Sequence, residues 1–184
     1  ILTALIKKQR SKFKYPNEQL DKLKKNINLF QVAKIHDINE FLNIRNQKKN
    51  RNASLSKNKI KKIEHYIWWL DNKVEKFKLI SRNKIKLTLW RKKILIKKKY
   101  FYTGGWSTSK TANINEIIAA YKKLLKTKKF KWIGVAKKEN RFLTWLNLRM
   151  GFNISKENDP STQIKQFIKL YKIKKTKSLN FFVN

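Results

Sequence analysis

The stretch FKWIGVAKKENRFLTWLNLRMGF (130–152) joins a short apolar segment to an amphipathic one through a polar turn. Its first part, FKWIGVA (130–136), is nearly all apolar, which is typical of a strand buried on both faces of a sheet. Asn140 opens an apolar pattern at helical spacing, and Gly151-Phe152 ends it. Asn accepts from the unpaired N–H groups of a helix start, and Gly permits a left-handed helix end. The stretch therefore predicts a strand followed by a helix.

Further elements are predicted on both sides of this stretch. Asn113-x-x-Glu116 predicts the capped start of the longest helix, and alternation over 77–89 and 99–106 predicts a two- or three-strand meander. A first strand at 28–35, a helix from Asp37, a helix near 58–70 and a last strand at 178–183 complete the order. The helix near 58–70 is expected to bury one apolar face: Ile60, Ile63, Ile67 and Leu70.

This order predicts an α+β fold, with a mixed, mostly antiparallel central sheet flanked by helices. Residues 1–28 are interpreted as a basic N-terminal extension or the tail of a preceding domain, because the chain begins at Ile1 without Met. Residues 29–153 form the predicted domain. Residues 154–184 are a basic C-terminal segment that could complete the sheet.

The composition excludes several classes of site. The chain has no Cys, and its only histidines, His36 and His65, do not lie in a spaced carboxylate cluster, so no metal site is predicted. No segment approaches the roughly 18–20 apolar residues of a membrane-spanning helix. A cytoplasmic protein is expected.

The net charge of +36 leaves two interpretations open. Such a charge attracts phosphates, which favours a nucleic-acid partner. However, only seven of the 47 basic residues are Arg, the better residue for bidentate phosphate contacts, and the lysines accompany abundant Asn and Ile along the whole chain. An A+T-rich coding sequence would give the same bias.

Three motifs in the same order resemble the GCN5-related N-acetyltransferase superfamily, in particular its bacterial amino-sugar N-acetyltransferases. FLNIRN (41–46) is similar to a motif of the family's first helix, HYIWWL (65–70) to the end of its second, and ENRFLTWLNLRMGF (139–152) to a later helix that begins with Asn and ends in Gly-Phe. The resemblance covers some 125 residues of the chain and implies acetyl-CoA as a substrate. Without it, Asn140 and Gly151 could simply begin and end a helix.

The resemblance also implies roles for individual residues. Asn140 would bind the pantetheine arm of coenzyme A. The family's glycine-rich phosphate loop corresponds here to GGWSTSKTANIN (104–115), in which the glycines fall before the turn and small hydroxyl residues take their place. The residues expected to bind the coenzyme are Trp106, Ser107, Ser109, Lys110, Thr111 and Asn140.

The catalytic groups are less clearly marked. Many members place a proton-donating Tyr seven residues after the Asn, where this chain has Asn147. Nothing in the sequence shows that Tyr102 or Tyr121 substitutes for it. The candidates for the base are His65 and Glu116, although His65 could instead pack beside Trp68 and Trp69, and Glu116 could be a helix cap.

Two functions therefore remain open at this point. The first is an acetyl-CoA-dependent N-acetyltransferase, in which the amine of a nucleotide-linked amino sugar attacks the thioester directly. The second is a basic RNA- or ribosome-associated protein with a degenerate, non-catalytic acetyltransferase-like fold, which the charge and the missing glycine turn and Tyr would fit. The sequence does not indicate an oligomeric state.

Overall fold

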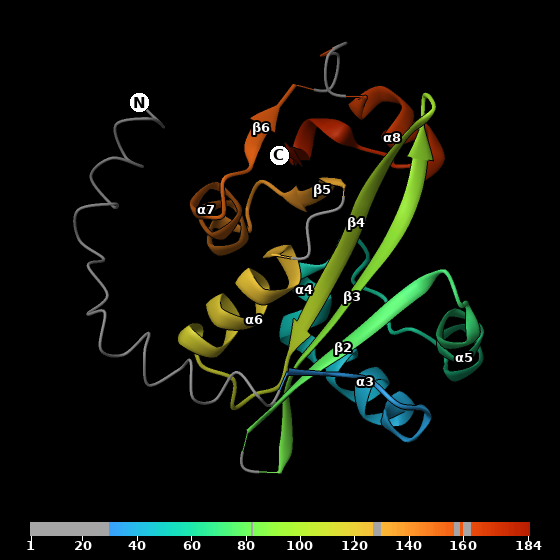
Figure 1. The fold of residues 1–184 in the computed structure, drawn as a ribbon, viewed down its shortest axis with the longest axis vertical. Helices are drawn as coiled ribbons and strands as arrows, with labels where there is room; N and C mark the ends of the chain where they lie inside the picture. Colours follow the sequence, from blue (N-terminus) through green and yellow to red (C-terminus); the bar gives the residue numbers. More distant parts are fainter. Residues whose placement is uncertain (1–29, 82, 127–129, 157–158, 160–162) are drawn as a thin grey trace.

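The computed structural model describes residues 30–81, 83–126, 130–156, 159 and 163–184. A seven-stranded sheet runs through this part of the chain in the order β1-β2-β3-β4-β5-β7-β6 (Figure 1). Its strands are β1 (Phe30–Val32), β2 (Val74–Ser81), β3 (Lys84–Ile96), β4 (Lys99–Thr108), β5 (Lys131–Lys137), β6 (Asn153–Ser155) and β7 (Leu179–Val183).

All neighbouring strands pair antiparallel except β4 and β5, which are parallel. These two pair over only two positions, Phe101 with Lys131 and Tyr102 with Trp132. Beyond that point β4 continues for six residues to Thr108, and β5 continues to Lys137. The sheet therefore splits into two halves that diverge along the second part of β4 and β5.

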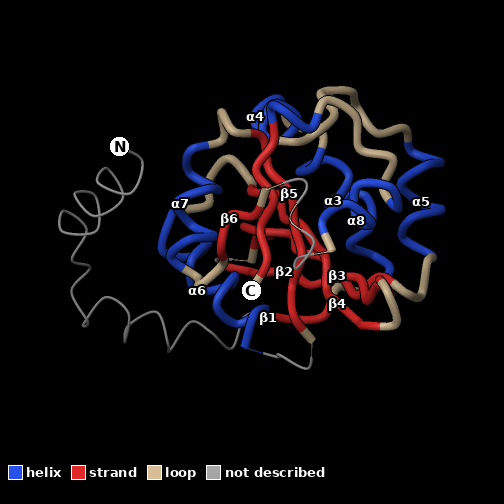
Figure 2. The backbone as a smooth tube through the Cα atoms, turned by 90° about the horizontal axis from the view of Figure 1, so that it is seen from above, coloured by secondary structure: helices blue, strands red, loops and turns tan. Residues whose placement is uncertain are grey.

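Helices cover both faces of the sheet, as the view from above shows (Figure 2). The α6 and α7 helices lie on one face, and α3, α5 and α8 lie on the other. The helices, with two short 3-10 turns, are η2 (Ile35–Asp37), α3 (Ile38–Arg45), α4 (Lys48–Ala53), α5 (Lys62–Leu70), α6 (Ile114–Lys126), α7 (Arg141–Arg149), α8 (Ile164–Leu170) and η3 (Thr176–Ser178). The predicted fold class is confirmed.

The alternation of side chains along the strands gives each face its own core. Leu87 and Leu89 of β3 belong to the cluster that packs under α6 and α7. Ile94 and Ile96, farther along β3, belong to the cluster under α8. β7, at the predicted position of the last strand, contributes to both clusters: Phe182 to the first and Phe181 to the second.

The predicted buried face of α5 is wrong. Ile63, Ile67 and Leu70 are 64%, 66% and 72% exposed, whereas His65 and Trp69 on the opposite face are buried. Trp69 packs edge-on against Phe41 of α3, with their ring centroids 5.0 Å apart. Both faces of α5 fit helical spacing, and the face that carries the larger aromatic rings packs against α3, because it removes more apolar surface from water.

Charged groups are also buried. The Lys78 ammonium lies 2.8 Å from the Asp37 carboxylate, and both side chains are almost fully enclosed. Asp37 also accepts from the Lys34 backbone N–H at 2.7 Å, so it ties η2 to β2 rather than capping α3 with its side chain.

Among the described residues, no helix has the length and apolar character needed to span a membrane, and no three His, Cys, Asp or Glu side chains gather where they could hold a metal ion.

Candidate active site

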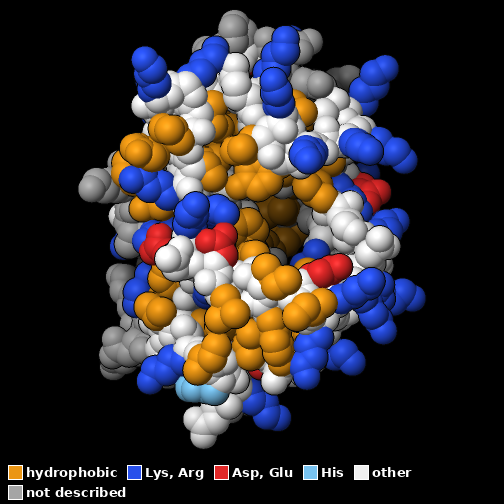
Figure 3. All heavy atoms as spheres, turned by 90° about the vertical axis from the view of Figure 1, so that its right-hand side faces the viewer, with side chains coloured by type: hydrophobic (Ala, Val, Ile, Leu, Met, Phe, Trp, Pro, Cys, Tyr) orange, Lys and Arg blue, Asp and Glu red, His pale blue; other side chains and the backbone are white. Residues whose placement is uncertain are grey.

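A cleft of about 510 Å³ crosses the sheet where β4 and β5 diverge. Residues of α6 and α7 line it on one face, including Tyr121, Asn140 and Asn147. Residues of α3 and α5 line it on the other face, including Arg45 and His65. Figure 3 shows the hollow on this second face, with hydrophobic side chains at its rim and Lys and Arg side chains around them. The residues that line this cavity thus come from both faces of the sheet.

The β4 edge that faces the slot has no partner in β5 beyond Tyr102. Ser109 donates its N–H to Lys86 of β3, whereas the neighbouring Thr108 turns its N–H and C=O the other way, to the Asn50 side chain. Backbone groups of alternate strand residues point to the same edge, so those of Gly104 and Trp106 face the slot with Thr108. Neither residue has a partner in β5, whose ladder with β4 ends at Tyr102. The slot therefore offers backbone N–H donors in a row.

Gly104 is required by close packing at this edge. A Cβ at this position would lie 2.3 Å from the Trp90 carbonyl oxygen and 3.1 Å from the Trp132 ring. Gly134, across the slot on β5, is different, because a Cβ there would meet nothing within 4 Å. A side chain at 104 would distort β3 and β4, whereas one at 134 would project into open space.

The α4 helix closes the wide end of the split. The buried Asn50 side chain donates to Thr108 O at 2.8 Å and to Ile44 O at 2.6 Å, and so holds α4 against the end of β4. On the other side, Lys137 at the end of β5 donates to Asn52 O at 3.0 Å. These contacts bridge the two diverging strands and fix the width of the cleft.

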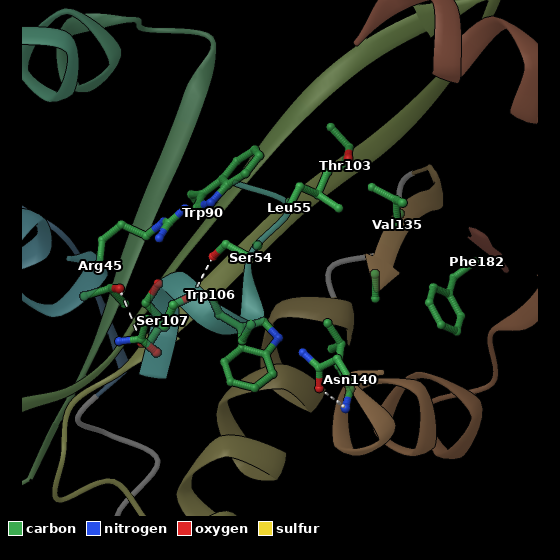
Figure 4. A pocket seen from close by; sticks show the side chains of 18 of the residues that line it. Arg45, Ser54, Leu55, Trp90, Thr103, Trp106, Ser107, Val135, Asn140 and Phe182 are labelled. Carbon is green, nitrogen blue, oxygen red and sulfur yellow. Dashed lines mark hydrogen bonds between the residues drawn. The ribbon is translucent and has the colours of Figure 1, made fainter. Parts of the chain in front are cut away.

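Both ends of α7 have the predicted capping geometry. The Asn140 side-chain oxygen accepts from the Leu143 N–H at 3.1 Å. Gly151 has φ +85°, and Phe152 N–H donates to Asn147 O at 3.1 Å, which completes a Schellman motif. The cap occupies only the oxygen of Asn140, and its amide group remains available on the side that lines the cleft (Figure 4).

The buried Tyr121 contacts Asn147, the residue that this chain has where the family pattern has a Tyr. The Tyr121 hydroxyl, from α6, donates to the Asn147 side-chain oxygen at 2.8 Å, and both residues line the cleft. Phe152 stacks parallel to the Tyr121 ring, with their centroids 6.5 Å apart. Burial raises the pKa of Tyr121 far above its ordinary value, so the hydroxyl keeps its proton.

His65 also lines the cleft, from α5. Its Nε2 lies 2.9 Å from Ile38 O, and because a carbonyl can only accept, Nε2 carries the proton. Burial lowers the pKa of His65, against the smaller opposing effect of this hydrogen bond. The ring is therefore neutral at pH 7, with Nδ1 left as the basic nitrogen. It also stacks on Trp68, with centroids 5.3 Å apart, so the packing interpretation holds beside the catalytic one.

The segment expected to bind phosphate lies between β4 and α6. Lys49 donates to Ser109 O at 2.6 Å, and Lys86 donates to the Thr111 hydroxyl at 2.7 Å. Lys110 is exposed on the same segment. The hydroxyls and ammonium groups thus form one cluster at the start of α6.

Glu116 occupies the N-terminus of α6 as a cap. Its carboxylate accepts from Asn113 N–H at 2.9 Å, and the Asn113 side chain accepts from Glu116 N–H at 2.9 Å. This is a reciprocal capping box. Of the residues predicted from the sequence, His65, Trp106, Ser107 and Asn140 line the cleft, whereas Glu116, Ser109, Lys110 and Thr111 are not among its lining residues.

Sequence reasoning missed two cleft-lining residues whose buried donors have no partner within the described part of the chain. They are Arg45, through Nη1, and Trp132, through Nε1. Arg45 was visible as part of FLNIRN, but nothing in the motif showed that its Nη1 would be buried without a partner among the described residues. The role of Asn50 could not be found either, because its partner Thr108 is 58 residues away.

The chain resembles known proteins in structure but not detectably in sequence. No protein-family model and no curated protein sequence matches the chain. Solved structures do match at TM-scores near 0.6. A GNAT superfamily phosphinothricin acetyltransferase from Sinorhizobium meliloti in complex with AcCoA has a TM-score of 0.62 at 12% identity, over 84% of this chain and 86% of that one.

Two further structures have different acceptors in their names. A ribosomal-protein-alanine N-acetyltransferase from Brucella melitensis has a TM-score of 0.62 at 11% identity, over 85% of this chain and 98% of that one. A spermidine N-acetyltransferase from Vibrio cholerae, in complex with CoA and spermine, has a TM-score of 0.59 at 11% identity, over 69% of this chain and 81% of that one. The chain thus has the GNAT fold.

Proposed function

We propose that the protein is an acetyl-CoA-dependent N-acetyltransferase. The observation that carries the proposal is the cleft that crosses the sheet between β4 and β5, because acetyl transfer needs two ligands to meet at one point. Its volume of about 510 Å³ lies within the range of small-molecule sites. Structures of this fold hold AcCoA or CoA, which supports the same ligand here.

The coenzyme would occupy the side of the cleft formed by α6 and α7. Its pantetheine arm is rich in amides, and the chain offers groups that suit amides: the Asn140 amide, and the backbone N–H groups of Gly104 and Trp106 that face the slot. The lysines around Ser109 and Thr111 would attract its phosphates. When bound, it supplies an acetyl group on a thioester, which an amine can attack directly.

The acceptor would enter from the face of α3 and α5. The amine nitrogen forms a bond to the acetyl carbon, and the sulfur leaves with the electron pair of the broken C–S bond. His65 Nδ1 is the basic nitrogen on this face, and its lowered pKa keeps it able to accept the proton of the amine. The strand N–H groups at the slot are placed to stabilise negative charge on the carbonyl oxygen.

Tyr121 is the group we assign as proton donor to the sulfur. It reaches the cleft from α6 rather than α7, and its hydroxyl meets Asn147, the residue at the position of the family's Tyr. Burial raises its pKa, so the hydroxyl is protonated at neutral pH and can donate to the sulfur as negative charge develops there. The acceptor class we propose, a nucleotide-linked amino sugar, rests only on the resemblance of the three sequence motifs at 41–46, 65–70 and 139–152.

Calorimetric titration with acetyl-CoA tests the proposal, and Asn140→Asp is the informative variant. Asp keeps an oxygen for the Leu143 N–H, and it suits a helix N-terminus, so the stability of α7 is preserved. It loses the amide donor, so the affinity for acetyl-CoA should fall by about tenfold or more. If wild-type protein does not bind acetyl-CoA, or if Asn140→Asp binds it equally well, this assignment fails.

A further inference from the structure

Arg45 is an uncompensated cation in the wall of the cleft. It stands at the end of α3, on the acceptor face, and Figure 4 shows its side chain reaching toward Trp90. Its Nη1 is buried and has no hydrogen-bond partner within the described residues. Burial lowers the pKa of Arg45, and the positive charge of Arg51 lowers it further.

No acidic group in the described structure pairs with this guanidinium. Glu64 lines the same cleft, but its carboxylate accepts from Lys61 N–H at 3.3 Å and forms no ion pair with Arg45. The nearby Arg51 is different, because it donates to Asn46 O at 3.1 Å and to Lys57 O at 2.9 Å and so holds the chain around it. Arg45 therefore has no structural role of this kind.

A partly buried cation without a partner destabilises the unliganded protein, because its lost hydration is not replaced. A bound oxyanion would offset this cost, because Arg presents a planar set of donors that fits the oxygens of carboxylate and phosphate. The neighbouring walls are aromatic: Trp68 and Trp90 pack edge to face, with centroids 6.2 Å apart. The site thus combines an apolar wall with one partly buried positive charge.

We propose that Arg45 binds an oxyanion, a carboxylate or phosphate group, carried by the amine acceptor, with the body of the acceptor against Trp68 and Trp90. This inference rests on the proposed function for the identity of the ligand as an acceptor. It narrows that function to amines that bear a negative charge near the nitrogen that is acetylated. A nucleotide-linked amino sugar belongs to this class through its phosphates.

The first test is the stability of the unliganded protein, which does not depend on activity. Arg45→Met keeps the length of the side chain and removes its charge, so Tm should rise by about 2–4 °C. Arg149→Met, the same change at an exposed position on the last turn of α7, is the control; it loses a cation–π contact with Trp145 and a favourable position at the helix end, so Tm should not rise and should fall only slightly. A lower Tm for Arg45→Met would show that Arg45 stabilises the fold, which would overturn the proposal.

The second test uses pairs of amines that differ mainly in the oxyanion: L-phenylalanine with L-phenylalaninamide, and glucosamine 6-phosphate with glucosamine. In at least one pair, wild-type protein should have a lower KM for the amine that carries the oxyanion than for the amine that lacks it. The pair that shows this difference tells whether the site binds a carboxylate or a phosphate. Arg45→Met should raise the KM of the amine that carries the oxyanion by about 10- to 100-fold. The KM of the amine that lacks it and the affinity for acetyl-CoA should stay unchanged. Arg149→Met should behave as wild type.

Measuring the binding of the amines alone tests the Arg45 site independently of the proposed acetyl transfer. The same four compounds are titrated calorimetrically into the protein without acetyl-CoA, so their affinities are measured even where no acetyl group is transferred. An anionic preference that Arg45→Met abolishes supports the site, even if acetyl-CoA fails to bind and the enzyme assignment falls. Equal affinity for the members with and without the oxyanion, or a preference that survives in Arg45→Met, overturns it.

Discussion

Replacing Tyr121 with Phe tests the proposed proton donor through a single atom. The hydroxyl donates to the Asn147 oxygen at 2.8 Å in a buried setting, so its removal leaves that oxygen without its donor. An unsatisfied buried polar group costs about 1–3 kcal/mol of unfolding free energy. If the hydroxyl also donates the proton to the leaving sulfur, kcat/KM should fall by about 10²–10⁴-fold, a range typical of general acid catalysis.

Asn147→Leu is the matched control, because it breaks the same hydrogen bond from the other side. It should reduce the free energy of unfolding by a similar amount, measured by urea unfolding, since the Tyr121 hydroxyl then lacks its acceptor. Its loss of kcat/KM, measured from CoA thiol release, should be much smaller than that of Tyr121→Phe. Comparable losses in the two variants, or wild-type activity in Tyr121→Phe, would show that Tyr121 only holds the core together.

Two further predictions follow from the titratable candidates. Because burial lowers the pKa of folded His65 below the value near 6.5 of an unfolded His, the unfolded chain binds more protons between these two values. The free energy of unfolding should therefore decrease as pH falls below 6.5, and urea unfolding of His65→Gln should show a weaker decrease. Glu116→Gln keeps an oxygen for Asn113 N–H, so it should cost about 0.3–1 kcal/mol, and kcat measured by thiol release should stay within a few-fold of wild type. A loss of a hundredfold would instead support the role of Glu116 as a base.

The parts of the fold that the sequence predicted well are those decided by neighbours in the chain. Asn140 and Gly151 cap α7 as expected, because a cap needs only the residues of one turn. The capping box of Asn113 and Glu116 is local in the same way. The face of α5 was not decided locally, because its aliphatic and aromatic stripes both have helical spacing, and α3 packs against the aromatic one.

The site itself depends on contacts that local patterns do not contain. The slot exists because β4 and β5 pair at only two positions, and no residue in either strand indicates where their ladder ends. The contact between Tyr121 and Asn147 joins two helices through residues that are 26 positions apart in sequence. That Arg45 Nη1 has no partner among the described residues depends on every group around it. Such features follow from packing, and could not be predicted from spacing.

The central claim is that acetyl-CoA occupies the slot between β4 and β5, and Gly134→Phe tests it most directly. A Cβ at this position meets nothing within 4 Å and the residue lines the cleft, so we expect a Phe ring to project into the cleft with little cost to Tm. We predict that wild-type protein binds acetyl-CoA saturably in a calorimetric titration and that Gly134→Phe, with Tm within a few degrees of wild type, does not. Equal affinity in the two proteins, or no binding by either, would contradict the account.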